Sequence, residues 1–196
     1  RLRISVIDGN PDTLIPMLLR GALDAVVCVQ DEPRDDPLVK QEVIFQERVR
    51  LLAGAAHPLA RQRRVKLNQT STYPWMLGWR TAGLAKSVEK LFAERDVKPP
   101  ATALDTTSVT FARSILGYGQ HLAVLPEHLF TPELEAGSLV ALDLDADLSG
   151  WSNPILLSYR RNSTRSPATM ALVTHLYDVA REKSGRAAAK PRRRKA

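Results

Sequence analysis

The feature that most constrains the fold is the alternation of short apolar runs with segments of helical periodicity. Residues 23–29 form a nearly continuous apolar run, and residues 74–78 and 121–125 are similar. Residues 13–20 and 84–95 carry apolar side chains at the spacing of one helix face. Continuous apolar strands are typical of sheets covered on both faces, and strand–helix–strand units imply a mainly parallel sheet. The sequence therefore predicts an α/β protein.

The remaining elements follow from turn and capping signals. A strand over residues 2–7 ends at a turn, after which Asn10 or Asp12 caps the helix of residues 13–20 and Gly21 closes it. Further strands are expected over residues 38–53, 101–104, 139–144 and 155–159, and further helices from Thr106–Ser108 to Leu116 and over residues 168–181.

The positive charge is concentrated at one end of the chain. The net charge is +7, and Ser184–Ala196 carries six basic residues and no acid, which leaves +1 for the remainder. The body is therefore nearly neutral, and residues 183–196 are expected to form a basic disordered tail. Two roles stay open for this tail: a solubilising end, or a source of non-specific contacts with phosphates.

Composition also bounds the compartment and the chemistry. A single cysteine, Cys28, excludes an internal disulfide framework, and its apolar neighbours favour a small buried side chain. The chain shows neither a membrane-spanning apolar run nor a secretory signal pattern, so we expect a cytoplasmic protein.

No constellation of catalytic residues can be assembled. The four histidines show no metal-ligand spacing, and both the GxSxG elbow and the Walker loop are missing. The Gly117–Gly119 segment lacks a third glycine, so a helix stop is the better interpretation than a dinucleotide site. We therefore expect no enzyme, catalytic residue, metal or cofactor.

Candidate binding residues follow two of the expected strands. Thr106, Thr107 and Ser108 precede a helix, whose free backbone N–H groups favour an anion, although one of these residues could simply cap the helix. Trp79, Arg80 and Thr81 follow the strand of residues 74–78. Open parallel sheets bind ligands at this end of their strands, and Arg80 could pair with a carboxylate or lie solvated on the surface.

Several motifs together resemble the effector-binding domain of LysR-type transcription regulators. Their order and spacing carry the resemblance, which covers roughly residues 1–182. The motifs are Leu19–Asp24, Ala56–Ala60, Leu116–Gly119 and Ala123–Pro126, with supporting matches at Tyr73–Trp75, Leu139–Leu144, Ile155–Arg160 and Ser166–Ala168.

This resemblance implies a two-lobed fold similar to type 2 periplasmic binding proteins, in which two α/β subdomains are joined by crossing strands. Residues 1–48 and 154–182 would form the first lobe and residues 49–153 the second. The sequence fits the family from its second strand onward. The DNA-binding head, the first strand and the first helix of the family are therefore expected to lie outside this chain.

The resemblance also implies a function and partners. A small-molecule effector, expected to be a carboxylate, would bind between the lobes and control DNA binding by a homodimer or tetramer. Asn10 and Thr13 would face the effector from the first lobe, although capping of their own helix is an equal alternative, and Tyr118 would add aromatic surface. The alternative function is that of a transporter's solute-binding receptor, which would share the fold.

Overall fold

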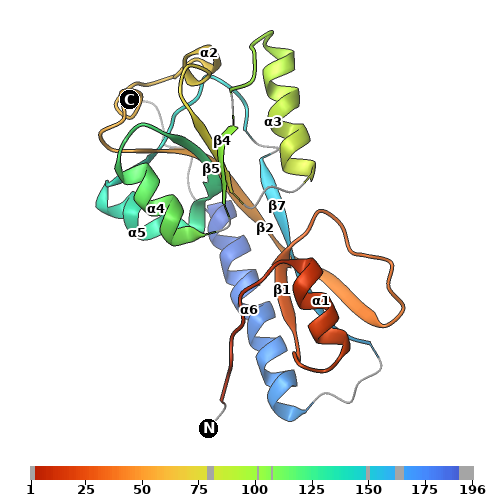
Figure 1. Cartoon of the computed structure of the whole chain (residues 1–196). Coiled ribbons are helices and arrows are strands. Elements are labelled where there is room, and N and C mark those ends of the chain that lie inside the picture. The colour runs from red at the N-terminus through yellow and green to blue at the C-terminus, as the bar shows by residue number, and fades with distance from the viewer. Residues whose placement is uncertain are drawn as a thin grey trace. The chain divides into compact units, whose positions relative to one another are not determined.

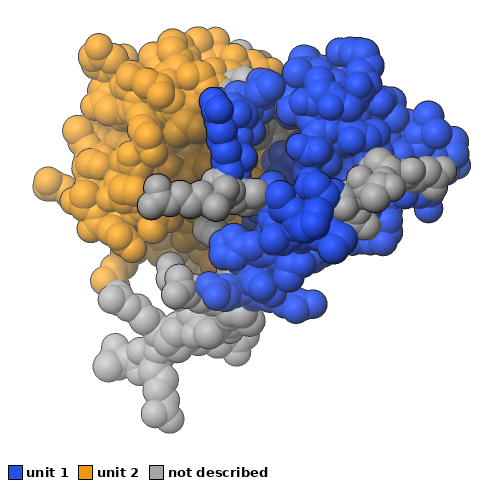
Figure 2. Space-filling view, turned by 90° about the horizontal axis from the view of Figure 1, so that it is seen from below, with its two compact units in different colours: residues 1–46, 154–196 blue, residues 47–153 orange. Residues whose placement is uncertain are grey.

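The chain divides into two compact units. The computed structural model describes residues 3–78, 82–100, 102–106, 108–148, 151–161 and 166–189. Unit 1 comprises residues 1–46 and 154–196, and unit 2 comprises residues 47–153 (Figure 2). Strands β2 (Val39–Gly54) and β7 (Ser152–Arg160) each begin in one unit and end in the other. The interpretation of these units as effector-domain lobes stays a prediction.

Unit 1 is a small sheet with a helix on each face. Strand β7 lies between β2 and β1 (Val26–Val29), and β1 runs antiparallel to it. Helix α1 (Pro11–Leu19) covers one face of this sheet, and α6 (Pro167–Ala189) covers the other (Figure 1). Side chains on the first face include Leu14, Leu18, Val26 and Val39, and those on the second include Leu157, Tyr159 and Val173.

Unit 2 contains the parallel sheet that the sequence predicts. Strand β3 (Trp75–Gly78) runs parallel to both β4 (Thr102–Thr106) and β5 (Leu122–Pro126). The end of β2 pairs antiparallel with β5 and with β6 (Leu139–Ala141). The strand order is therefore β2-β5-β3-β4, with β6 beside β2.

Helices cover both faces of this second sheet. Helices α2 (Leu67–Thr70) and α3 (Ala82–Glu94) pack on the face that contains Trp75 and Val124. The opposite face, which contains Met76 and Leu125, packs against α4 (Val109–Gly117), the 3-10 helix η1 (Glu127–Phe130) and α5 (Thr131–Ala136). Because the central strands are buried on both faces, their sequences read as continuous apolar runs.

The family-like motifs meet in unit 2 where the backbone packs most closely. A Cβ atom added to Gly54 would lie 2.2 Å from the carbonyl oxygen of Leu116. Gly119, with φ of 72°, packs against Ala56 and the backbone of His57. Close packing therefore requires glycine at position 54, and the left-handed backbone favours glycine at position 119. Gly119 follows the end of α4, where the sequence predicts that this helix stops.

Two predictions for unit 1 are wrong. Residues 3–7 of the expected first strand are not in a strand, and the side chains of Ile4 and Val6 are exposed. A strand needs a hydrogen-bonded neighbour, and none of the described strands pairs with this segment. Strand β1 is antiparallel rather than parallel to its neighbour β7, and Val27 is 44% exposed, so β1 is not covered fully on both faces.

Two expected boundaries also differ. Strand β6 ends at Ala141 rather than at residue 144, because Leu144 forms only an isolated bridge with Val65. Helix α6 continues through Ala189, so residues 183–189 extend the helix instead of beginning a disordered tail. Alanine, lysine and arginine have high helix propensity, and this explains why the helix can continue past its packed part.

Candidate functional site

The carboxyl ends of the parallel strands of unit 2 meet at one edge of the sheet. Gly78, the last residue of β3, pairs with Thr106, the last residue of β4. Strand β5 is parallel to β3 and ends at Pro126. Helix α4 begins directly after β4, at this same edge. In open α/β sheets this edge is where ligands bind, so it is the candidate site of unit 2.

Thr106 and Ser108 form the turn between β4 and α4. The Ser108 Oγ accepts a hydrogen bond of 3.2 Å from the backbone N–H of Phe111, which makes Ser108 the N-cap of α4. The Thr106 Oγ1 accepts one of 3.1 Å from the backbone N–H of Ser108. Both oxygens act as acceptors here, so each hydroxyl proton stays available for donation to a ligand. The positive end of the helix dipole favours an anion at this place.

Four of the expected site residues lie outside the described residues. They are Trp79, Arg80, Thr81 and Thr107. The strand ends that precede them, Gly78 and Thr106, are described and are paired. Their roles as ligand contacts stay predictions.

The structure does not bring Tyr118 to the same edge. Tyr118 is the C-cap of α4 and is 79% exposed. Ser108 is the N-cap of the same helix, and a helix rises 1.5 Å per residue, so Ser108 and Tyr118 are separated by about 15 Å along the helix axis. Tyr118 lies shortly before β5 begins, at the amino-terminal edge of the parallel strands.

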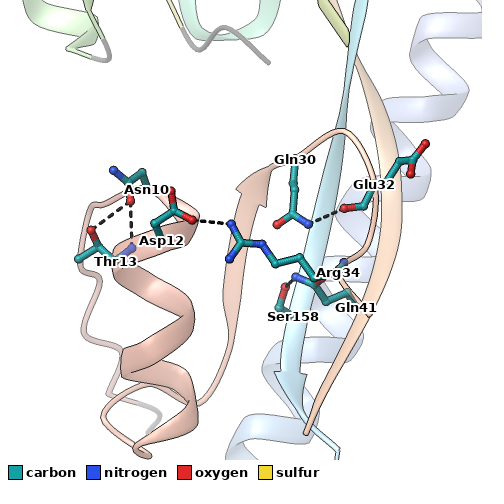
Figure 3. A network of polar contacts seen from close by, with 8 residues as sticks. All are labelled: Asn10, Asp12, Thr13, Gln30, Glu32, Arg34, Gln41 and Ser158. Carbon is teal, nitrogen blue, oxygen red and sulfur yellow. Dashed lines mark hydrogen bonds and ion pairs between the residues drawn. The ribbon is translucent and has the colours of Figure 1, made fainter. Parts of the chain in front are cut away.

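In unit 1, Asn10 and Thr13 form the start of α1. The Asn10 Oδ1 accepts hydrogen bonds from the backbone N–H of Thr13, at 2.9 Å, and from the Thr13 Oγ1, at 3.0 Å (Figure 3). Asn10 is therefore the cap, and the other candidate, Asp12, instead pairs with Arg34 at 2.5 Å. Whether Asn10 and Thr13 also contact a ligand stays a prediction.

A polar network that the sequence analysis missed extends from Arg34 in unit 1. The Gln41 Oε1 accepts a hydrogen bond of 2.6 Å from the backbone N–H of Arg34, and the Gln41 Nε2 donates one of 2.8 Å to the Ser158 Oγ (Figure 3). The Gln30 side chain donates to the carbonyl of Glu32, and its Oε1 is buried with no hydrogen-bond partner among the described residues. These contacts fix the loop between β1 and β2.

A second missed cluster lies where β2 passes the end of β5. Arg48 and Arg50 on β2 approach the Glu127 Oε2, with nitrogen–oxygen distances of 3.9 and 3.5 Å. Glu47 lies next to Arg48, and its Oε1 is 2.8 Å from the Nδ1 of His128. Since Val49 pairs with Pro126, continuing this register places Glu47 opposite His128.

Glu47 is the most deeply buried ionisable residue of this cluster. It is 4% exposed, and its Oε2 has no hydrogen-bond partner within the described part of the chain. The sequence does carry a signal for it. Side chains two residues apart lie on the same face of a strand, so Glu47 shares a face with Val49, Leu51 and Ala53, which are buried. An acidic residue on a buried strand face is uncommon unless it is paired, and this makes Glu47 recognisable in the sequence.

His57 has a structural role in the turn after β2. It is 2% exposed, and its Nδ1 accepts a hydrogen bond of 3.1 Å from the backbone N–H of Leu59. Its ring lies 4.4 Å from that of Tyr73, measured between centroids. Burial lowers the pKa of His57 below its usual value of 6.5, so the neutral ring is favoured.

Metal binding and membrane insertion find no support in the described residues. Among them, no three His, Cys, Asp or Glu side chains come together in a way that could hold a metal ion. The described helices also include none with the length and apolar character needed to cross a membrane.

Comparison with known proteins identifies relatives. The RuBisCO operon transcriptional regulator of Allochromatium vinosum is 27% identical over 172 residues, which are 87% of this chain and 54% of that protein. The regulator PcaQ of Agrobacterium fabrum is 23% identical over 180 residues, which are 91% of this chain and 57% of that protein. The chain thus spans little more than half the length of these relatives.

A solved structure and a family model complete the comparison. The effector-binding domain of QuiR in complex with shikimate superposes with a TM-score of 0.66 at 19% identity, covering 89% of this chain and 79% of that one. This similarity confirms the predicted α/β fold of the LysR regulatory-domain type. The model of the LysR substrate binding domain matches residues 1–181, so the chain belongs to the LysR substrate binding domain family.

Proposed function

We propose that this chain is the ligand-sensing domain of a LysR-type transcription regulator and that it binds a small carboxylate effector. One observation carries the assignment of the site: Gly78 pairs with Thr106, so two strand ends meet where α4 begins. Effector binding at this edge uses the hydroxyls of Thr106, Thr107 and Ser108. The start of α4 and Arg80 both favour negative charge on the ligand.

The names of the relatives favour a regulator over a solute receptor of a transporter. Two relatives are named as transcription regulators, and the QuiR domain is described as bound to shikimate, a small hydroxylated carboxylate. In the whole protein, the effector would change the arrangement of units or subunits, because a ligand shifts only an equilibrium between states that it binds differently. A DNA-binding head outside this chain, a homo-oligomer and a cytoplasmic location belong to the same proposal.

A thermal-shift screen with small organic acids tests the effector class. An acid present at a hundred times its Kd should stabilise the fold by about 2.7 kcal/mol. A screen in which uncharged or cationic compounds stabilise the chain, and acids do not, would contradict a carboxylate effector.

Substitutions then test the position of the site by calorimetry with a stabilising acid. Arg80→Ala should weaken binding by about 2 kcal/mol if the arginine pairs with a desolvated carboxylate. Thr107→Val should weaken it by about 1 kcal/mol, because one neutral hydrogen bond is lost. Arg61→Ala is the matched control, because Arg61 is exposed on a loop of the same unit and should not affect affinity. Unchanged affinity in both site variants would move the effector away from this edge.

A further inference from the structure

Glu47 lies at the edge of the unit 2 sheet where the parallel strands end. Strand β2 runs antiparallel to β5, with Val49 opposite Pro126, the last residue of β5. Glu47 comes two residues before Val49, so it lies just beyond the carboxyl end of β5. The ends of β3 and β4, Gly78 and Thr106, are at the same edge.

One oxygen of this buried carboxyl group has no hydrogen-bond partner among the described residues. The Glu47 Oε1 is bound by His128 at 2.8 Å, whereas Oε2 is shielded from solvent and makes no hydrogen bond to any described residue. Proteins seldom leave such an atom unsatisfied, because a carboxylate loses strong hydrogen bonds to water when it is buried. A donor from outside the protein would satisfy it.

The nearby arginines on β2 do not serve Glu47. Arg48 and Arg50 alternate with Glu47 and Val49 along the strand, so their side chains emerge on the opposite face. There they approach the carboxylate of Glu127, at 3.9 and 3.5 Å. The contact between Glu47 and His128 is therefore separate from the cluster of Arg48, Arg50 and Glu127, and Glu47 retains an acceptor atom.

We propose that Glu47 receives a hydrogen-bond donor of the effector, either a hydroxyl or an ammonium group. This inference rests on the proposed effector site at the same edge and narrows its ligand to hydroxylated or amino carboxylic acids. The acid group binds at the ends of β3 and β4, where α4 begins, and the donor group binds Glu47. A carboxylate can only accept hydrogen bonds, so an acid without a donor leaves the Oε2 atom unsatisfied.

Strand spacing sets the size of this ligand. Neighbouring strands are about 4.8 Å apart, and β5 lies between β2 and β3, so Glu47 is separated from the end of β3 by roughly 10 Å before side chains reach inward. The donor and the carboxylate must therefore be separated by about the width of a six-membered ring. A hydroxyl on the carbon next to the carboxylate is too close to it to reach Glu47 while the carboxylate binds at the start of α4.

The test compares acids with and without a donor on the complete 196-residue chain. The ring-sized pairs are shikimate with cyclohexenecarboxylate, para-hydroxybenzoate with benzoate, and, for the ammonium arm, trans-aminomethylcyclohexanecarboxylate with cyclohexanecarboxylate. Lactate with propionate is the short pair. We expect at least one donor-bearing ring acid to bind at least about tenfold more tightly than its parent acid, and no such preference in the short pair.

Variants of Glu47 assign the preference to this residue. Glu47→Leu, which removes both acceptor oxygens, should bring the affinity ratio within a ring-sized pair close to one, while the parent acid keeps its Kd. Glu47→Asp, which withdraws the carboxylate from the ligand, should also reduce the ratio and serves if the leucine variant does not fold. The control Arg61→Gln should retain the wild-type ratio.

The outcomes separate this inference from the proposed function. If acids bind but the donor preference is absent, or if it persists in both Glu47 variants, the role of Glu47 is refuted and the effector-sensing function stands. If no acid of either kind binds, the carboxylate effector and the role of Glu47 are both refuted.

Discussion

At the scale of single residues, His57 links the stability of unit 2 to pH. Its ring is buried beside Tyr73, and burial holds its pKa below the usual 6.5. In the unfolded chain, His57 has the usual pKa of about 6.5. At a pH between the lower folded-state pKa and this value, the unfolded chain binds a proton at His57 that the folded chain does not bind. The free energy of unfolding should therefore decrease as the pH is lowered from about 7.5 through 6.5, and the loss should end once the pH falls below the folded-state pKa.

The variant His57→Asn isolates this contribution. Asparagine can still accept the hydrogen bond from the backbone N–H of Leu59, but it does not titrate, so the slope of stability against pH near 6.5 should become shallower. Urea denaturation at a series of pH values measures it. His175→Asn is the control, because His175 is exposed on α6 and its replacement should leave the slope unchanged. Equal slopes in the wild type and His57→Asn would contradict the account.

Gly54 and Gly117 make a matched pair for packing. Gly54→Ala places a Cβ atom 2.2 Å from the Leu116 carbonyl oxygen, so backbone must move, and we expect a loss of at least about 2 kcal/mol of stability. Gly117, the last residue of α4, has no atom within 4 Å of an added Cβ, so Gly117→Ala should be neutral or slightly stabilising. Thermal unfolding of both variants compares their stabilities. If Gly54→Ala is as stable as the wild type, the backbone around Leu116 is not packed as closely as described.

At the scale of elements, sequence periodicity predicted what is local and failed for what depends on distant partners. The helix α3 and the strand β3 follow from patterns within a few residues. The direction of β1 does not, because its neighbour β7 is more than a hundred residues away in the sequence. The same limit applies to the candidate site. A helix start at Thr106–Ser108 was expected, and Ser108 does cap α4, although β4 runs two residues past its expected end at Leu104 and includes Thr106. The contact between Glu47 and His128 was not expected, because it depends on the pairing of β2 with β5.

The start of α1 allows a test at this scale. Asn10→Ala removes the acceptor for the backbone N–H of Thr13 and should lower the free energy of unfolding by about 1 kcal/mol. Asn10→Asp keeps an acceptor at the same place and should change stability by less than about 0.5 kcal/mol. Urea denaturation of the two variants decides whether the cap matters. If both bind the effector as the wild type does, Asn10 caps the helix and takes no part in binding.

At the scale of the whole molecule, the positive charge is unevenly distributed. Six of the charges that make up the net +7 lie in Ser184–Ala196, directly after the part of α6 that packs on unit 1. The rest of the chain is nearly neutral and offers no net attraction for a polyanion. Attraction to DNA by this chain should therefore come from its end and should carry no sequence information, because phosphate contacts do not read bases.

Replacing the six basic residues of Ser184–Ala196 with glutamine, which has a similar helix propensity, tests this prediction. The wild-type chain should bind a short DNA duplex weakly and without regard to sequence. If all six charges contact phosphates, the logarithm of its affinity should fall with the logarithm of salt concentration with a slope of about −5. The variant should lose most of this binding in fluorescence anisotropy, whereas the exposed-loop control Arg61→Gln with Arg63→Gln should keep it. Binding by the variant that resists salt and distinguishes one DNA sequence from another would mean that the folded body itself recognises DNA.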